Sequence, residues 1–140
     1  MLNKMTVPFV IFLFTVMVCG CSSNFVVVDR MGMTFNLTRV KLEHGDFVEI
    51  LDGEAIRIVP LQRIEKIVLD PSKTYYRDDK LYYHAVVELI DGTMIKPRKS
   101  GGKVTKSFVN IHNTVIGQGN SGEILIPLED VNVLSQSKLE

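Results

Sequence analysis

The histidine side chains are the first candidates for chemistry in this 140-residue sequence. His44 and Asp46 flank Gly45, so one loop could supply two metal ligands, and His112 could supply a third. However, no two histidines have a spacing that places both imidazoles on one helix face or one strand face. We therefore expect scattered surface histidines, with no metal ion and no cofactor bound.

Carboxylates are dense in one predicted hairpin, which contains Asp46, Glu49, Asp52 and Glu54. General acid–base catalysis requires two carboxylates held together, with the pKa of one of them raised. These four residues surround a turn, where a hairpin is normally solvated. No Gly-x-Ser-x-Gly nucleophile motif is present. We therefore expect no catalytic residues and predict that the protein is not an enzyme.

Two groups of side chains suggest a contact surface. Five basic residues lie between positions 96 and 106, and all four tyrosines lie between positions 75 and 83. Tyrosine offers a large contact area with one polar end, and basic loops bind anionic head groups or polymers. The structural alternatives are a solvated hairpin and tyrosines packed at the join between two repeats. The residues that we predict for an interaction surface are Tyr75, Tyr76, Tyr82, Tyr83, Lys96, Arg98 and Lys99.

The overall charge argues against nucleic-acid binding. The chain has 16 basic and 16 acidic residues, and removal of residues 1–20 would take away only Lys4, leaving a formal charge of −1. Nucleic-acid binders usually carry a basic excess, because neutralised phosphates and released counterions drive their binding. We expect no nucleic-acid partner.

The N-terminus has the organisation of a secretory signal. Lys4 provides a weakly positive start, and Val7 to Val18 form a run without charge that is too short to span a bilayer. Val18-Cys19-Gly20-Cys21 follows. This motif resembles the lipobox of bacterial lipoproteins, which is an aliphatic residue, a variable residue, a small residue and an invariant cysteine.

The resemblance implies a lipid anchor at Cys21. The Cys21 thiol would receive a diacylglyceryl group, a peptidase would cut after Gly20, and the new amine could be acylated. An uncleaved anchor helix or an ordinary signal cut elsewhere are the alternatives. Ser22, rather than Asp, follows the cysteine. In a Gram-negative host this residue implies attachment to the outer membrane, facing the periplasm.

The remainder of the sequence predicts an all-β fold. Short β-branched runs at residues 25–28, 47–51, 55–59 and 85–90 are bounded by turns that contain glycine. Asp91-Gly92 indicates a tight hairpin. No segment keeps a helical apolar period over 11 residues, so we expect no long helix after the signal helix.

An internal repeat organises these strands. Residues 26–35 align with 86–95, and Ile58-Val-Pro60-Leu61-Gln-Arg-Ile64 aligns with Leu125-Ile-Pro127-Leu128-Glu-Asp-Val131. Proline ends each strand, and a single 3₁₀-like turn should direct the leucine and the following Ile64 or Val131 into one core. This pattern resembles the small SH3-like or Sm-like barrels. It implies two barrels of this type, and one β-sandwich built from both repeats is the alternative.

These features predict the organisation and the role of the chain. The expected division is a signal over residues 1–20, a lipidated tether over 21–24, a first β repeat over 25–69, a linker over 70–81, a second β repeat over 82–134 and a polar tail over 135–140. The function that we predict is a membrane-anchored interaction or scaffolding module with an envelope protein partner. The alternative is a binder of a small ligand, a metal ion or a cell-envelope glycan.

Overall fold

The computed structural model describes residues 24–137, so the predicted signal at residues 1–20 and the lipidated Cys21 lie outside the described residues. The strands are β1 (Phe25–Asp29), β2 (Thr34–Leu42), β3 (Phe47–Asp52), β4 (Ala55–Pro60), β5 (Ile64–Arg77), β6 (Lys80–Leu89), β7 (Met94–Ile95), β8 (Lys99–Ser100), β9 (Lys103–Val104), β10 (Ser107–Asn110), β11 (Thr114–Gly119), β12 (Gly122–Pro127) and β13 (Val131–Gln136). Two 3₁₀ turns, η1 (Leu61–Arg63) and η2 (Leu128–Asp130), precede β5 and β13.

The prediction of an all-β fold is confirmed. Residues 24–137 contain no α-helix, and no helix among them is long and apolar enough to cross a membrane. The Asp91-Gly92 hairpin is also confirmed, because β6 and β7 pair across it and Gly92 has a φ of 88°. Glycine takes this left-handed conformation without steric cost.

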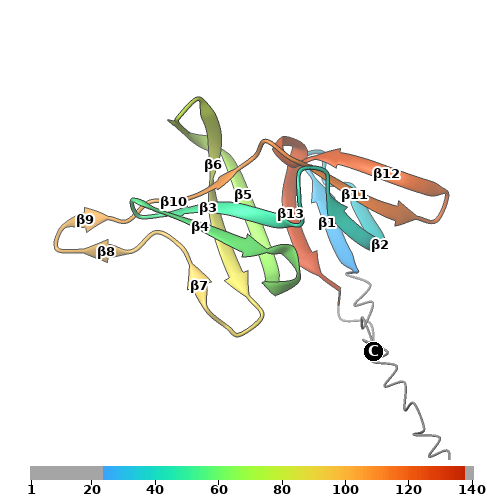
Figure 1. Ribbon diagram of the computed structural model, residues 1–140, viewed down its shortest axis with the longest axis horizontal. Coiled ribbons are helices and arrows are strands. Elements are labelled where there is room, and N and C mark those ends of the chain that lie inside the picture. Colours follow the sequence, from blue (N-terminus) through green and yellow to red (C-terminus); the bar gives the residue numbers. More distant parts are fainter. Residues whose placement is uncertain (1–23, 138–140) are drawn as a thin grey trace, which may run out of the picture.

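One curled antiparallel sheet forms most of the body (Figure 1). Its strand order is β12-β11-β2-β1-β13-β5-β6-β10-β3-β4, and β7 adds to β6. The strands β8 and β9 form a separate hairpin at one side of the body. The two ends of the described chain lie together, because the Ser137 N–H donates to the Asn24 carbonyl at 2.8 Å.

The segments predicted as two repeats interleave in this sheet. The half that runs from β12 to β13 takes β1 and β2 from the first repeat and β11, β12 and β13 from the second. The half that runs from β5 to β4 takes β3, β4 and β5 from the first repeat and β6 and β10 from the second. The predicted boundaries at 25–69 and 82–134 therefore do not separate two structural units, because each repeat gives strands to both halves.

The halves join where β5 pairs with β13. Ile67 lies opposite Leu134, and Lys66 and Val68 lie opposite Ser135 and Val133. Ile67 and Leu134 are 67 residues apart and occupy equivalent positions in the predicted repeat alignment. Both side chains are fully buried in one hydrophobic cluster that extends through both halves.

The proline turns behave as predicted from the sequence. Pro60 has φ −57° and ψ 138°, and Pro127 has φ −55° and ψ 137°, so the two turns have nearly the same backbone conformation. Leu61 and Leu128 each follow a proline and are 1% exposed. Ile64 and Val131 lie in the same cluster, which confirms that both turns direct their side chains into one core.

The segment predicted as a linker, residues 70–81, is part of a β-hairpin instead. It contains the end of β5, a turn at Asp78 and Asp79 with φ of 51° and 61°, and the start of β6. A register shift between Asp70 and Thr74 accommodates Pro71, which lacks a ladder donor. Polar composition and Pro71 suggested a loop, but tyrosines and threonine suit a strand. The predicted polar tail at 135–140 also differs, since β13 continues to Gln136.

The join between the halves predicts a large effect of one substitution. Ile67→Ala should lower the free energy of unfolding by about 2–5 kcal/mol, because it removes buried methyl groups from the shared core. Urea unfolding followed by circular dichroism should show a single transition, because each half needs strands from both repeats.

The neighbouring Val68→Ala is the matched control. Val68 is exposed on the other face of the same strand, so its truncation should cost less than about 1 kcal/mol. Two separate unfolding transitions, or equal effects of the two substitutions, would contradict the interleaved core.

Candidate functional site

The candidate site lies where the chain crosses between the two halves of the sheet. The loop of residues 43–46 leads from β2 in one half to β3 in the other, and the loop of residues 111–113 leads from β10 back to β11. The two loops are joined by hydrogen bonds. The Glu43 N–H donates to the Thr114 carbonyl at 3.0 Å, and the His44 N–H donates to Asn113 Oδ1 at 3.0 Å.

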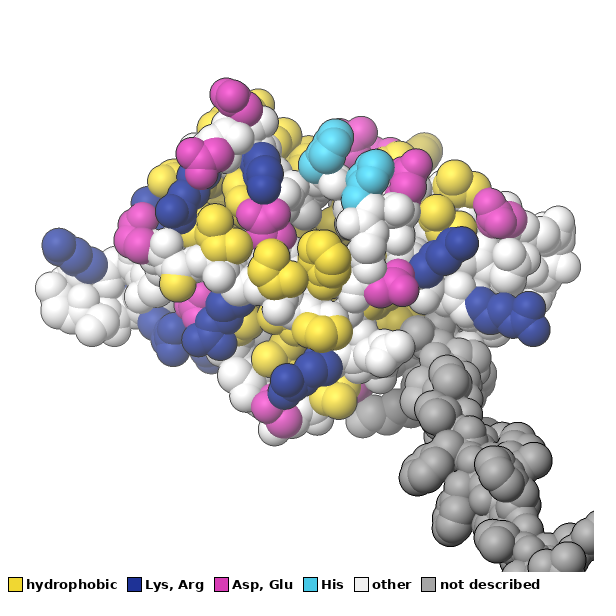
Figure 2. Space-filling model, in the orientation of Figure 1, with side chains coloured by type: hydrophobic (Ala, Val, Ile, Leu, Met, Phe, Trp, Pro, Cys, Tyr) yellow, Lys and Arg dark blue, Asp and Glu magenta, His cyan; other side chains and the backbone are white. Residues whose placement is uncertain are grey.

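Two histidines stack at this crossover. The rings of His44 and His112 have centroids 5.6 Å apart and planes within 5° of each other. Figure 2 shows two histidine side chains beside one another on the surface, with carboxylates nearby. The sequence placed His44, Asp46 and His112 in one candidate set, and the structure brings the two histidines together. Asp46 faces elsewhere, because its Oδ1 accepts the Leu42 N–H at 3.1 Å.

A cleft of about 570 Å³ opens beside these histidines. Its lining includes Glu43, His44, Asp79, Lys80, His112 and Glu129. A smaller hollow of about 180 Å³ shares both histidines and extends to Glu49. Three carboxylates against one lysine make the larger cleft a place for a polar or cationic ligand. Within residues 24–137, no three His, Cys, Asp or Glu side chains are already arranged to hold a metal ion.

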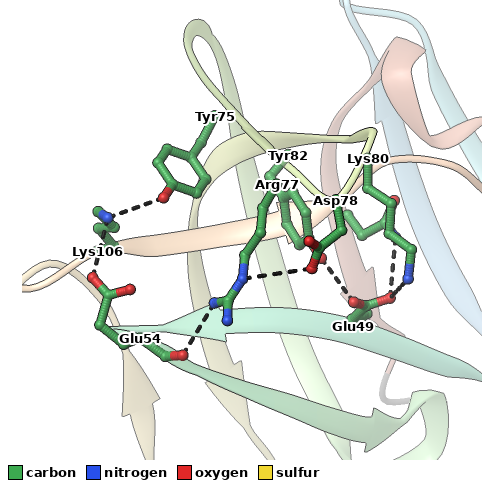
Figure 3. Close-up of polar contacts among 9 residues, drawn as sticks. Glu49, Glu54, Tyr75, Arg77, Asp78, Lys80, Tyr82 and Lys106 are labelled. Atoms are coloured by element: carbon green, nitrogen blue, oxygen red, sulfur yellow. Dashed lines mark hydrogen bonds and ion pairs between the residues drawn. The ribbon is translucent and has the colours of Figure 1, made fainter.

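Glu49 is the centre of a polar network at the edge of the smaller hollow (Figure 3). Its carboxylate accepts hydrogen bonds from Tyr82 Oη at 2.7 Å, Asn110 Nδ2 at 3.1 Å and Lys80 Nζ at 3.4 Å. Burial raises the pKa of Glu49, but these three donors outweigh burial and bring the pKa below its ordinary value. Burial, together with the bond to Glu49, raises the pKa of Tyr82 to about 12.

The other carboxylates of the β3–β4 hairpin are also bound to donors. Asp52 contacts Arg57 at 3.0 Å and Arg98 at 3.1 Å, and Glu54 contacts Lys106 at 3.1 Å. None of these contacts is a carboxylate pair of the kind that raises the pKa of an acid catalyst. The hairpin carboxylates therefore act as anchors for neighbouring strands.

A second set of contacts holds the β5–β6 hairpin against the β3–β4 turn (Figure 3). Lys106 Nζ donates to Tyr75 Oη at 3.2 Å and lies 4.5 Å from the centre of the Tyr75 ring. Arg77 Nη1 donates to the Glu54 carbonyl at 3.1 Å. The hydrogen bonds with Tyr75 and Glu54 raise the pKa of Lys106, so it stays charged and keeps these contacts.

The structure separates the four tyrosines that the sequence grouped. Tyr82 is 1% exposed, so its inclusion in a surface patch was wrong. Tyr83 is half-buried against the core beneath Arg30, and Tyr75 is half-buried beside the Phe108 ring. Tyr76 is 69% exposed. Neighbouring residues on a strand face opposite sides, which accounts for the separation of each pair.

The basic residues predicted for the interaction surface also differ in their contacts. Lys96 and Lys99 are exposed, and Lys99 begins the β8–β9 hairpin. Arg98 Nη2 is bound to Asp52, so its charge is already engaged with the body of the protein. The basic surface at this side is therefore carried by lysines. The expectation of scattered histidines was wrong for His44 and His112, which two loops distant in sequence bring into a stack. The Glu49 network joins strands that are distant in sequence, and sequence spacing gave no signal for it.

Comparisons of the chain with protein-family models, with curated proteins and with solved structures give no match.

The Glu49–Tyr82 bond predicts a pH-dependent contribution to stability. Tyr82→Phe should lower the free energy of unfolding by about 1–3 kcal/mol at neutral pH, because it leaves a half-buried carboxylate without its closest donor. The folded-state pKa of about 12 exceeds the ordinary value of 10.0. The contribution is therefore complete below pH 10 and is lost as the pH rises towards 12.

Tyr76→Phe is the matched control, since this exposed hydroxyl should contribute almost nothing. Urea unfolding at neutral and alkaline pH measures both variants. Equal stability of the two variants at neutral pH would contradict the structural role of the Glu49–Tyr82 bond.

Proposed function

We propose that this protein is a lipid-anchored envelope protein whose β-body is a non-catalytic interaction or scaffolding module. The observation that carries the proposal is the Val18-Cys19-Gly20-Cys21 motif directly after an uncharged apolar run. The acyl chains on Cys21 would fasten the protein to the membrane. In a Gram-negative host, Ser22 favours the outer membrane, with the body in the periplasm.

The sequence leaves a very short tether between the lipid and the sheet. An extended chain spans at most about 3.5 Å per residue, so Phe25 of β1 lies within about 14 Å of Cys21. One acyl chain binds a membrane only marginally, whereas two or three chains give a durable anchor. The body would therefore remain at the membrane surface, where its contacts are made with other envelope components.

Several contacts support a binding role in preference to catalysis. The carboxylates Glu49, Asp52 and Glu54 are each bound to donors from neighbouring segments, which fixes the shape of the body. Exposed lysines, exposed apolar side chains and Tyr76 remain on the surface. A rigid body with such surfaces suits a protein that binds a partner in the envelope.

We also propose that the two halves of the sheet are a pair of SH3-like barrels with exchanged strands. Each half has a similar order of strands: β13 is followed by β1, β2 and the β11–β12 hairpin, and β5 is followed by β6, β10 and the β3–β4 hairpin, with β7, β8 and β9 inserted between β6 and β10. In each half the hairpin and the strand β13 or β5 come from one repeat, and the two strands between them come from the other. The matched proline turns support the same equivalence.

A second candidate function is the binding of a small ligand in the crossover cleft. The stacked His44 and His112 and the carboxylates of Glu43 and Glu129 support it. Imidazole and carboxylate groups bind divalent transition metals, and a polar cleft of this size could also hold a glycan fragment.

The anchoring proposal is tested at the N-terminus of the protein produced in its bacterial host. Mass spectrometry should find a mature chain that begins at lipid-modified Cys21, and the protein should be in the membrane fraction. Cys21→Ala should abolish both results, because the acylated thiol is lost.

Cys19→Ala is the matched control, because Cys19 occupies the variable position of the motif and should leave anchoring unchanged. A native chain that is freely soluble, or that still carries residues 1–20, would overturn the anchoring proposal.

The ligand-binding candidate is tested by thermal-shift measurements with divalent metal ions and with cell-wall fragments. A ligand that binds only the folded state raises the midpoint of unfolding. His44→Ala should remove the shift, whereas His84→Ala should retain it, because His84 does not line the cleft. No shift with any of these ligands would remove this candidate.

A further inference from the structure

The sheet has two free edges, which are β4 at one end of the strand order and β12 at the other. The Leu61 N–H donates to the Asp46 carbonyl, so residues 55, 57 and 59 of β4 are the ones whose backbone groups bond to β3. The backbone groups of Ile56 and Ile58 therefore face away from the sheet. By the same alternation, the backbone groups of Glu123 and Leu125 on β12 face away from β11.

Prolines limit the length of both edges. Pro60 and Pro127 occupy positions whose backbone groups face away from the sheet. The N–H donor that each proline lacks would therefore have lain on the free edge. Each edge therefore offers a short row of backbone donors and acceptors, and the two rows have the same length. Such a row is a template for pairing with another strand.

Large apolar side chains are exposed beside these rows. Ile58 on β4 is 58% exposed, and its equivalent Leu125 on β12 is 56% exposed. Phe47 and Ile56 extend the apolar surface on the β4 side. Figure 2 shows hydrophobic side chains gathered over the region where β3 and β4 lie in Figure 1.

The β4 edge has a small excess of positive charge, whereas the β12 edge is acidic. Arg57 and Arg63 lie along the β4 edge, where Asp52 is shared between Arg57 and Arg98 and Asp91 is 3.9 Å from Arg63. The β12 edge carries exposed acidic side chains, which are Glu123 on the strand and Glu129 and Asp130 in η2. Arg63 and Asp130 are equivalent positions of the two repeats, so the repeats have acquired opposite charges there.

The shapes beside the two edges are also complementary. A groove of about 420 Å³ lies beside β4, and its lining includes Ile58, Pro60, Arg63 and Asp91. The β11–β12 hairpin, by contrast, projects from the body at the side away from β8 and β9 (Figure 1). A projecting strand and a groove beside a free edge are suited to pair with each other.

We propose that a second copy of this chain docks by pairing its β12 edge antiparallel to β4, with Leu125 of the second copy opposite Ile58. The pairing would form about four backbone hydrogen bonds and cover both apolar side chains. The basic β4 edge would then lie beside the acidic β12 edge. Because the two surfaces differ, the contact is head-to-tail and can extend through successive copies.

The alternative symmetric pairings are disfavoured by charge. Pairing β4 with β4 so that Ile56 lies opposite Ile58 would bring Arg57 of one copy against Arg57 of the other, and pairing β12 with β12 would place two Glu123 side chains on the same pair of strands. Like charges on neighbouring strands are destabilising. The head-to-tail contact uses residues of the described strands only, so it does not depend on whether Cys21 carries lipid.

The test uses the full chain in mild detergent with Cys19→Ser and Cys21→Ser, so that only introduced thiols react. Ile58→Cys and Leu125→Cys are made separately, mixed and oxidised. A disulfide-linked dimer should form in the mixture and not in either variant alone, because the contact joins β4 to β12. Adding Ile58→Lys to the Leu125→Cys chain, or Leu125→Lys to the Ile58→Cys chain, changes only an edge that this contact does not use, so the dimer yield should stay unchanged. Adding Ile56→Lys to the Ile58→Cys chain puts a charge on the β4 edge that the contact does use, and it should reduce the dimer yield about tenfold.

Val104→Cys is the matched control, because Val104 is 61% exposed but lies on β9, away from both edges. It should form no dimer with either variant. Dimer formation by Ile58→Cys alone would overturn the head-to-tail contact in favour of a symmetric one. The absence of any dimer in the mixture, with the chain monomeric in analytical ultracentrifugation, would overturn the proposal altogether.

Discussion

The structure depends on the fact that each half of the sheet needs strands from both of the segments predicted as repeats. β1 and β2 lie between β13 and β11 of the second repeat, while β6 and β10 lie between β5 and β3 of the first. A repeat of this length buries too little surface alone. Interleaving of the strands, together with the direct pairing of Ile67 and Leu134, places most of the buried apolar side chains in one core.

Polar contacts then fix the parts of the sheet that the core does not reach. The outer half of the β5–β6 hairpin lies beyond the main cluster and is held by Glu49 with Tyr82, and by Lys106 with Tyr75 and Glu54. Hydrogen bonds to a charged group are stronger than those between neutral groups. The crossover loops are held in a similar way by backbone and Asn113 contacts, and these contacts bring His44 beside His112.

The sequence predicted local features well and the connections between them poorly. Alternating β-branched residues predicted the strands, and the Pro-Leu pattern predicted turns that bury Leu61 and Leu128, because these depend on neighbouring residues. Which repeat supplies each strand depends on pairing between distant segments, and no local pattern encodes it. The same limit applies to the site. Glu49 and Tyr82, or His44 and His112, meet only after the repeats have exchanged strands.

The meeting of Asn24 and Ser137 at one point of the sheet has a mechanical consequence. β1 is bonded along its length to β2 on one side and to β13 on the other. A pull on the chain ahead of Asn24, directed along β1, would have to shear both rows of hydrogen bonds at once. The body would resist such a load better than if its first strand lay at an edge, where bonds can open one after another.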